Sequence, residues 1–337
     1  MSNIIFWRRG LAAVALLFSV TVALAHGDTA SITTYDDYTY INAQTGTEVR
    51  IYVEGDTRYM IANGIPDHET GTFPGEGVQP QDYNYTAPAN PVLADAPTFG
   101  GLGKFGLTIV GVPLEREAAE WHNDDRNSGW QYDILGGALN LGIDINNAHI
   151  QSGGLYHYHG VPTALVESFE PTEHPHLVGF AGDGFPVYVL FGYTDAEDPS
   201  SAVIEMESSY RLKTGTRPDG PGGAYDGTYN EDWEYVEGAG DLDECNGRTG
   251  VTPQFPEGTY YYLVTNTYPR IPMCWAGTPD DGWRSPQGGQ GGGPGGGQGG
   301  GPGGDNGERS GPPPGGRGGG QGQGGQGGPP PRPGSGG

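Results

Sequence analysis

The sequence predicts an all-β or β-dominated domain, sandwich-like, with long loops. Short runs rich in β-branched and aromatic residues recur along the chain, and glycine or proline ends most of them. In "TEVRIYVEG", Val49, Ile51 and Val53 alternate onto one face, as in a half-buried strand. Helical patterns are scarce: only "PLEREAAEWHN" (113–123) has a proline at its start and acidic residues early. A β-rich chain with frequent turns typically folds as two packed sheets.

Further strands are expected where tyrosine and β-branched residues cluster between turn signals. These runs are "TRYMIANGI" (57–65), "FGLTIVGVPL" (105–114), "WQYDIL" (130–135), "HLVGFAGDGFPVYVLFGY" (176–193) and "GTYYYLVTNTY" (258–268). Residues 66–100 show no such run and are expected to form an irregular loop.

The two ends of the chain differ in composition from a globular domain. Residues 1–25 combine Arg8 and Arg9 with an apolar run and a small-residue cleavage site, which is the pattern of a signal peptide. Residues 286–337 are mainly glycine, proline and glutamine, so they cannot bury enough apolar surface to fold and are expected to form a disordered tail. The β-rich domain is therefore expected at 26–285. We expect an exported protein, periplasmic or extracellular, without an integral membrane span after cleavage, whose tail could contact other surface components.

The chain is strongly acidic, with a formal net charge of −25. It offers no basic stripe to phosphates, which argues against a nucleic-acid partner. The acidity favours solubility outside the cell and could also attract cations. The two cysteines, Cys245 and Cys274, are expected to form one disulfide, because the C-x-x-C spacing typical of thiolate metal ligands is absent.

Histidines are the residues that most strongly suggest a function. Two of the eight, His157 and His159, lie one residue apart in "GGLYHYHGVP", so on a strand both imidazoles point to the same face. A turn at Gly153 and Gly154 would fold His149 back beside them in a hairpin. Neutral imidazole is a common ligand of copper and zinc. The sequence therefore predicts a three-histidine site for copper or zinc, against the alternative that these histidines only pack and form hydrogen bonds.

Other histidines are weaker candidates for metal binding. His68 lies in a loop shaped by proline and glycine. His174 and His176 form a second pair, but Pro175 between them indicates a loop that enters a strand. Cleavage of the signal peptide would make His26 the N-terminal residue, whose amine and ring nitrogen could both bind copper.

Two tyrosines alternate with the paired histidines. Tyr156 and Tyr158 would point to the opposite face of the strand. Packing against another layer is the simpler role for them. The alternative is a hydroxyl that hydrogen-bonds to the metal ligands.

Five motifs together resemble the secreted YHYH-domain family. They are "NGIPDH" (63–68), "AHIQSGGLYHYHGVP" (148–162), "GFAGDGFPVY" (179–188), "LDECNGRTGVTPQFPEGTYYYLVT" (242–265) and "PMCWAG" (272–277). The likeness spans most of residues 60–277. It implies an exported, β-rich domain whose biochemical activity is unassigned.

Acidic residues suggest two further sites. A short loop beside Cys245 carries several oxygen ligands, which could hold calcium or could simply form a turn pinned by the disulfide. These residues are Asp241, Asp243, Glu244 and Asn246. Asp183, in "GDGFP", is expected first as a turn residue and second as a carboxylate near the histidines.

Three functions remain open at this point. The first is capture of copper or zinc by a secreted protein. The second is a metalloenzyme, in which three histidines leave a position for water or oxygen and Asp183 or Asp67 is the general base. The third is a structural or adhesive surface protein. The sequence contains no G-x-S-x-G motif, P-loop or dinucleotide fingerprint after a strand.

Overall fold

The computed structural model describes residues 35–73, 75, 77–167 and 175–284, and β-strands dominate them, as predicted. The predicted signal peptide, His26, His174 and the predicted tail lie outside the described residues. All described residues belong to one unit of the chain. Within them, no helix has both the length and the apolar character needed to cross a membrane.

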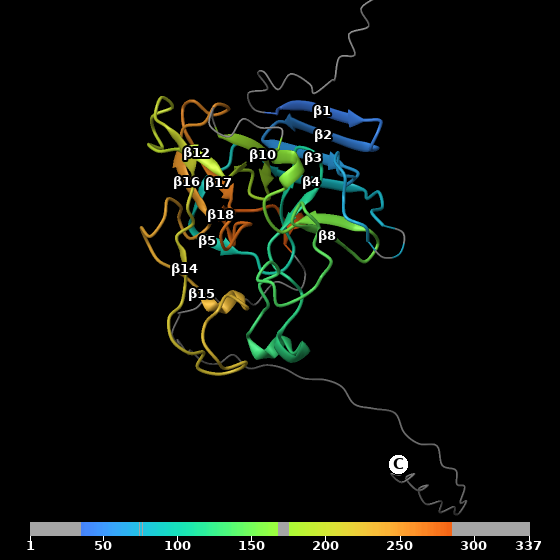
Figure 1. The fold of residues 1–337 in the computed structure, drawn as a ribbon. Helices are drawn as coiled ribbons and strands as arrows, with labels where there is room; N and C mark the ends of the chain where they lie inside the picture. Colours follow the sequence, from blue (N-terminus) through green and yellow to red (C-terminus); the bar gives the residue numbers. More distant parts are fainter. Residues whose placement is uncertain (1–34, 74, 76, 168–174, 285–337) are drawn as a thin grey trace, which may run out of the picture. The chain divides into compact units, whose positions relative to one another are not determined.

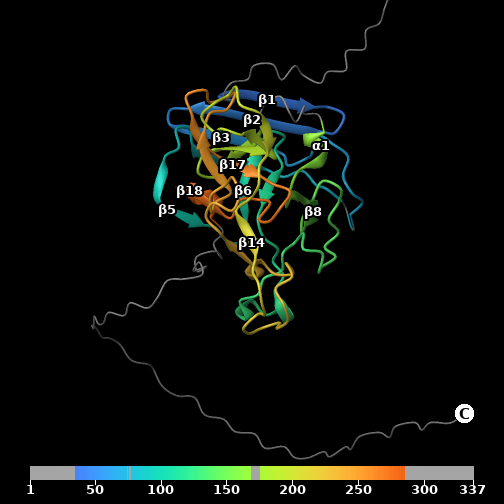
Figure 2. The same cartoon turned by 60° about the vertical axis from the view of Figure 1, so that its left-hand side comes forward.

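One sheet contains four antiparallel strands in chain order. These are β1 (Asp37–Asn42), β2 (Thr47–Glu54), β3 (Thr57–Ala62) and β4 (Tyr83–Pro88). The predicted alternation in β2 is observed, because Val49 and Ile51 are buried while Glu48 and Arg50 are exposed. Figures 1 and 2 show the blue strands β1, β2 and β3 of this sheet lying together along one side of the described chain.

A second sheet contains eight strands in the order β16-β17-β11-β10-β6-β7-β9-β8. The pairs β11–β17 and β7–β9 are parallel and the other pairs are antiparallel. In chain order the strands are β6 (Lys104–Thr108), β7 (Pro113–Glu115), β8 (Ala148–Gln151), β9 (Leu155–Tyr158), β10 (His176–Ala181), β11 (Pro186–Val189), β16 (Gly247–Gly250) and β17 (Thr259–Val264).

The remaining elements are short. Three two-stranded ribbons pair β5 (Leu93–Phe99) with β18 (Cys274–Gly277), β12 (Phe191–Tyr193) with β13 (Val203–Glu205), and β14 (Tyr210–Leu212) with β15 (Trp233–Tyr235). The helices are α1 (Thr163–Val166) and four single 3₁₀ turns, η1 (His122–Asp124), η2 (Arg126–Ser128), η3 (Asn230–Asp232) and η4 (Asp281–Trp283).

The two larger sheets pack against each other, which gives the sandwich-like arrangement. The guanidinium carbon of Arg58, on β3, lies 4.0 Å from the ring centre of Phe180, on β10. The turn between β6 and β7 also contacts the four-stranded sheet. A Cβ added to Gly111 in this turn would lie 2.6 Å from Ala62 and 2.7 Å from Val49, so the backbone approaches β2 and β3 closely.

The core is rich in aromatic residues and contains the predicted disulfide. Trp275 and Tyr262 are fully buried, and their polar atoms are paired: the Trp275 indole N–H donates to the carbonyl of Phe105 (2.9 Å). Burial of large rings with a satisfied polar end stabilises the core. Cys245 and Cys274 form a disulfide with a Cα–Cα distance of 4.9 Å, which confirms that prediction.

Asp183 is a buried carboxylate in this core. It accepts hydrogen bonds from the Tyr262 hydroxyl (2.5 Å) and the Gly277 amide (2.8 Å). Burial nevertheless raises the pKa of Asp183 to about 6, because the charged form loses its hydration. Between about pH 4 and pH 6, Asp183 is therefore mostly protonated in the folded chain and mostly ionised in the unfolded chain.

This shift predicts a pH-dependent stability. Asp183 stabilises the folded chain fully below its unfolded pKa of about 4, and this contribution is lost as the pH rises through about 6. Two pKa units correspond to about 3 kcal/mol. Urea unfolding at pH 4, 5, 6 and 7 measures this fall in the free energy of unfolding. Asp183→Asn reports the pH dependence of all other groups, and wild type should lose about 3 kcal/mol more than this variant as the pH rises. Parallel curves for the two proteins would contradict the prediction.

The predicted helix at 113–123 is wrong. Pro113–Glu115 instead form β7, which pairs with β6 on one side and β9 on the other, and a helical turn begins only at His122. All three residues of β7 are buried. Pairing with the neighbouring β6 and the distant β9, together with burial of the short segment, outweighs its local helical pattern.

Two further expectations need correction. Residues 130–135 form no named strand; Gln131 makes only an isolated bridge to Trp121, and Tyr132 one to Tyr229. Residues 66–100 are not one irregular loop, because they contain β4 and β5. Both strands find their partners outside this segment, which a local pattern does not reveal.

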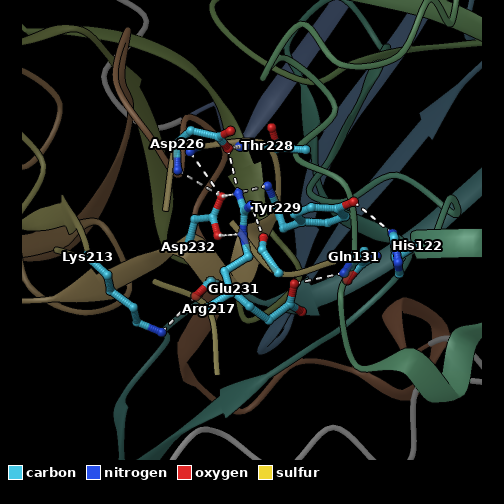
Figure 3. Close-up of polar contacts among 11 residues, drawn as sticks. His122, Gln131, Lys213, Arg217, Asp226, Thr228, Tyr229, Glu231 and Asp232 are labelled. Carbon is cyan, nitrogen blue, oxygen red and sulfur yellow. Dashed lines mark hydrogen bonds and ion pairs between the residues drawn. The ribbon is translucent and has the colours of Figure 1, made fainter. Parts of the chain in front are cut away.

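An ion pair fixes the loop between β14 and β15 (Figure 3). The Nε and Nη2 atoms of Arg217 donate to the Asp232 carboxylate at 2.7 and 2.6 Å. The Glu231 carboxylate accepts a hydrogen bond from the Gln131 amide (2.8 Å), which joins this loop to the segment after η2. This ion pair and this hydrogen bond therefore stabilise the loop and its contact with the preceding segment.

Candidate metal centre

The histidine cluster is built on the β8–β9 hairpin. The two strands are antiparallel, and His149 lies directly opposite His157. The turn uses Gly153 and Gly154, both with positive φ, as the sequence predicts. His159 follows the end of β9, and its amide donates to the carbonyl of Asn147 (2.7 Å), which continues the extended backbone. The hairpin therefore places three imidazoles on one face.

The three imidazoles converge on one point. One ring nitrogen from each of His149, His157 and His159 can be chosen so that all three lie within 4.8 Å of one another. The Nε2 atoms of His149 and His159 are 3.3 Å apart. His157 and His159 are each only 3% exposed, and His149 is half-buried. This arrangement could hold a metal ion, and it is the single such group of His, Cys, Asp or Glu side chains among the described residues.

Backbone carbonyls orient two of the rings. His149 Nδ1 donates to the carbonyl of Leu141 (2.9 Å), and His157 Nδ1 donates to the carbonyl of Leu155 (3.1 Å). In a neutral imidazole the other nitrogen, Nε2, then carries a lone pair. Metal-bound histidines in proteins are usually held in this way, with the second ring nitrogen bonded to a carbonyl or carboxylate.

The environment favours the neutral form of the two buried rings. Burial lowers the pKa of His157, and nearby Glu115 partly opposes this effect. Burial lowers the pKa of His159 further below its usual value, and the neighbouring histidines add to the shift. A neutral ring is the form that binds a metal. The Nδ1 of His159 is buried and forms no hydrogen bond of standard geometry; a backbone hydrogen bond between His159 and Glu115 only partly opposes the fall in the pKa.

Glu115 is a neighbour of the cluster that the sequence does not reveal. Its Oε2 atom lies 3.7 Å from Nε2 of His157. Lys104 Nζ lies 3.5 Å from Oε1, and Gln151 Nε2 is 3.3 Å from each carboxylate oxygen. Glu115 reaches this position because β7 pairs with β9, a contact between segments far apart in the chain. Because the sequence around Glu115 predicts a helix, it gives no indication of this contact with the hairpin.

The opposite face of β9 has a different environment. Tyr156 and Tyr158 are fully buried there, and the Tyr156 hydroxyl donates to Asp144 (2.8 Å). His68 Nδ1 donates to the carbonyl of Glu69 (2.9 Å), so its Nε2 accepts from the Tyr158 hydroxyl (2.6 Å). The structure therefore does not bring His68 into the cluster: both of its ring nitrogens are engaged on the tyrosine face.

The other proposed site residues also lie away from the three imidazoles. Asp67 accepts from the Tyr40 hydroxyl (3.1 Å), and Asp183 bonds to Tyr262 and Gly277, so neither carboxylate hydrogen-bonds to a histidine of the cluster. His176 begins β10, which is separated from β9 by β6 and β7. Three strand spacings amount to about 14 Å, too far for a shared ion.

The acidic loop beside the disulfide forms a turn. Asp243 accepts from the amides of Cys245 and Gly247, both at 2.9 Å, and from the Tyr260 hydroxyl. Asp241 accepts from the amide of Glu207 (2.8 Å). The loop, including Glu244, lines an open groove of about 760 Å³. Asn246 instead donates into the core, to the carbonyl of Leu263 (2.8 Å). The four side chains do not gather around one point, so the turn is the interpretation that the geometry favours over calcium binding.

The turn at Gly154 offers a test of how strongly the hairpin controls the cluster. Gly154 has φ +70°, and an added Cβ would lie 2.6 Å from the carbonyl oxygen of Gly77. Gly154→Ala should therefore shift β8 relative to β9. Any Zn²⁺ held by the three histidines should then bind at least about 10-fold more weakly, since displaced ligands lose the geometry that an ion requires. Isothermal titration with Zn²⁺ measures this effect.

Gly46→Ala is the matched control for backbone strain. Gly46 has φ +83°, but no heavy atom lies within 4 Å of an added Cβ. We expect it to cost about 1–2 kcal/mol of stability without changing the affinity for Zn²⁺. Equal affinities for the two variants would show that the turn does not control the cluster.

The sequence of the chain matches the family described as YHYH protein over residues 84–277, which include the hairpin, Glu115 and both cysteines. Neither a curated protein nor a solved structure matches it. The family match covers more than half of the chain and includes the sequence Tyr-His-Tyr-His at residues 156–159. The chain belongs to the YHYH protein family.

Proposed function

We propose that the protein binds one zinc or copper ion through His149, His157 and His159. The observation that carries this proposal is the convergence of three imidazoles, two of them buried, on one point. The separation of 3.3 Å between two Nε2 atoms suits nitrogens that each lie about 2.0–2.1 Å from one tetrahedral ion. Imidazole suits both zinc and copper.

Packing alone accounts less well for the cluster. Without an ion, a proton on Nε2 of His159 is needed to bridge it to His149, since Nδ1 of His149 already donates to Leu141. The neutral His159 ring would then leave its Nδ1 as a buried acceptor without a donor. An ion at Nε2 satisfies the facing lone pairs together and leaves the proton of His159 on Nδ1, from which it can be donated to the backbone carbonyl of Glu115.

Elemental analysis of the purified full chain tests the proposal. After removal of metal by a chelator and dialysis against Zn²⁺ or Cu²⁺, wild type should retain about one ion per chain and His157→Ala/His159→Ala close to none. His122→Ala is the matched control, because His122 pairs with the Tyr229 hydroxyl (3.0 Å) outside the cluster (Figure 3). Equal metal contents in wild type and the double variant would refute the proposal.

We also propose that the protein acts outside the cytoplasm, in the periplasm or the extracellular space. The signal-like pattern of residues 1–25 supports this, and so does the disulfide, because oxidising compartments preserve such bonds. The intact mass of protein recovered from the periplasm or the medium should correspond to a chain that begins at His26. Recovery of the uncleaved chain from the cytoplasm alone would contradict this location.

A further inference from the structure

We propose that Glu115 is the fourth protein ligand of the bound ion, so that three imidazoles and one carboxylate enclose it. This inference rests on the proposed metal binding and defines the coordination at the same site. It also makes Zn²⁺ a better fit than Cu⁺, because a carboxylate oxygen is a poorer ligand for Cu⁺ than thiolate or thioether sulfur.

The first support is the contact between Glu115 and His157. Their Oε2 and Nε2 atoms are 3.7 Å apart, which is too long for a hydrogen bond. Because His157 Nδ1 donates to Leu155, both facing atoms are acceptors when the ring is neutral. An ion about 2.0–2.2 Å from each atom fits this separation, and it turns an unfavourable contact into two coordination bonds.

The second support is the way Glu115 is held. The residue is only 8% exposed, yet its carboxylate has long contacts: 3.5 Å to Lys104 and 3.3 Å to Gln151. A buried carboxylate is costly unless short hydrogen bonds or a close cation compensate for its lost hydration. Of the three histidines, only His157 forms a close contact with this carboxylate in the described structure, so the flexible side chain must turn from Lys104 and Gln151 toward the ion when it binds.

A fourth protein ligand changes what the site can do. Catalytic zinc sites keep one position open for water or substrate, whereas sites that store zinc or stabilise a fold fill all four positions with protein ligands. Closure by Glu115 therefore favours zinc capture over the metalloenzyme alternative. Lys104 competes with the ion for the same carboxylate, so Lys104→Met should bind Zn²⁺ more tightly than wild type.

Cobalt substitution tests this inference on the full chain. Wild type loaded with Co²⁺ should show the intense visible absorption of a four-coordinate ion, and added azide should leave the spectrum unchanged because no position is open. Glu115→Gln should bind Zn²⁺ and Co²⁺ about 10–100-fold more weakly and acquire an azide-dependent spectrum. Glu48→Gln, an exposed position on β2, is the matched control and should resemble wild type.

The possible failures are distinguishable. If azide changes the wild-type Co²⁺ spectrum and Glu115→Gln gives the same spectrum, Glu115 is not a ligand, while metal binding by the histidines stands. If wild type takes up neither Co²⁺ nor Zn²⁺, the proposed function itself fails. The azide titration of wild type needs no variant, so a folding defect in Glu115→Gln does not prevent the decision.

Discussion

Zinc at 1,000 times its dissociation constant is expected to raise the free energy of unfolding by about 4 kcal/mol. The reason is that the three imidazoles meet only in the folded hairpin, where His149 on β8 faces His157 on β9. In the unfolded chain the flexible glycines at 153 and 154 separate His149 from the other two histidines, so an ion held by all three would bind almost exclusively to the folded state. The energy of binding then adds to the stability of the fold.

Urea unfolding with and without Zn²⁺ measures this gain. His157→Ala/His159→Ala should show no zinc-dependent shift, although it is less stable from the outset because two buried side chains are lost. His122→Ala should retain the full shift. A shift of equal size in the double variant would place the zinc elsewhere in the chain.

Loss of the disulfide is expected to lower the free energy of unfolding by about 3–4 kcal/mol. Cys245 and Cys274 are 29 residues apart, and the bond restricts the unfolded chain by closing this loop. The loop contains β16 and β17, the last two strands at one edge of the larger sheet. Both cysteines are buried, so replacing them also changes the packing of the core.

The comparison of Cys245→Ala/Cys274→Ala with wild type, by denaturant unfolding under oxidising conditions, measures this effect. Reduced wild type is the control that separates the cross-link from the change of side chains, and it should lose most of the same stability. If reduction leaves the stability of wild type unchanged, the cross-link contributes little to the fold.

The parts of the candidate site that follow local rules could be predicted from the sequence. His157 and His159 share a face because side chains on a strand alternate, and two glycines return the chain to His149 within a few residues. The disulfide could also be predicted, because the two cysteines of a chain with a signal-like segment are expected to pair with each other. Metal binding at the cluster stays a prediction.

The parts that depend on distant contacts could not be predicted. Glu115 reaches His157 only because β7 inserts between β6 and β9, and its sequence resembles the start of a helix. His68 had the right chemistry for a ligand, but Tyr158 engages its Nε2 on the other face. Such contacts follow from the order of strands in the sheet, which a local pattern does not encode.

The alternation of tyrosine and histidine in β9 also fixes the register of the sheet edge. β8 is the terminal strand, with a neighbour on one side only, and an edge of this kind is where strands slip most easily. A slip of the β8–β9 hairpin by one residue against β7 would turn the imidazoles of His157 and His159 into the tyrosine layer and both phenols toward Glu115. The hydroxyls would lose Asp144 and His68, and His157 would lose its contact with Glu115. Each face of the strand thus disfavours the misaligned pairing independently. The Tyr-His-Tyr-His sequence therefore fixes the register through its tyrosine face and through its histidine face.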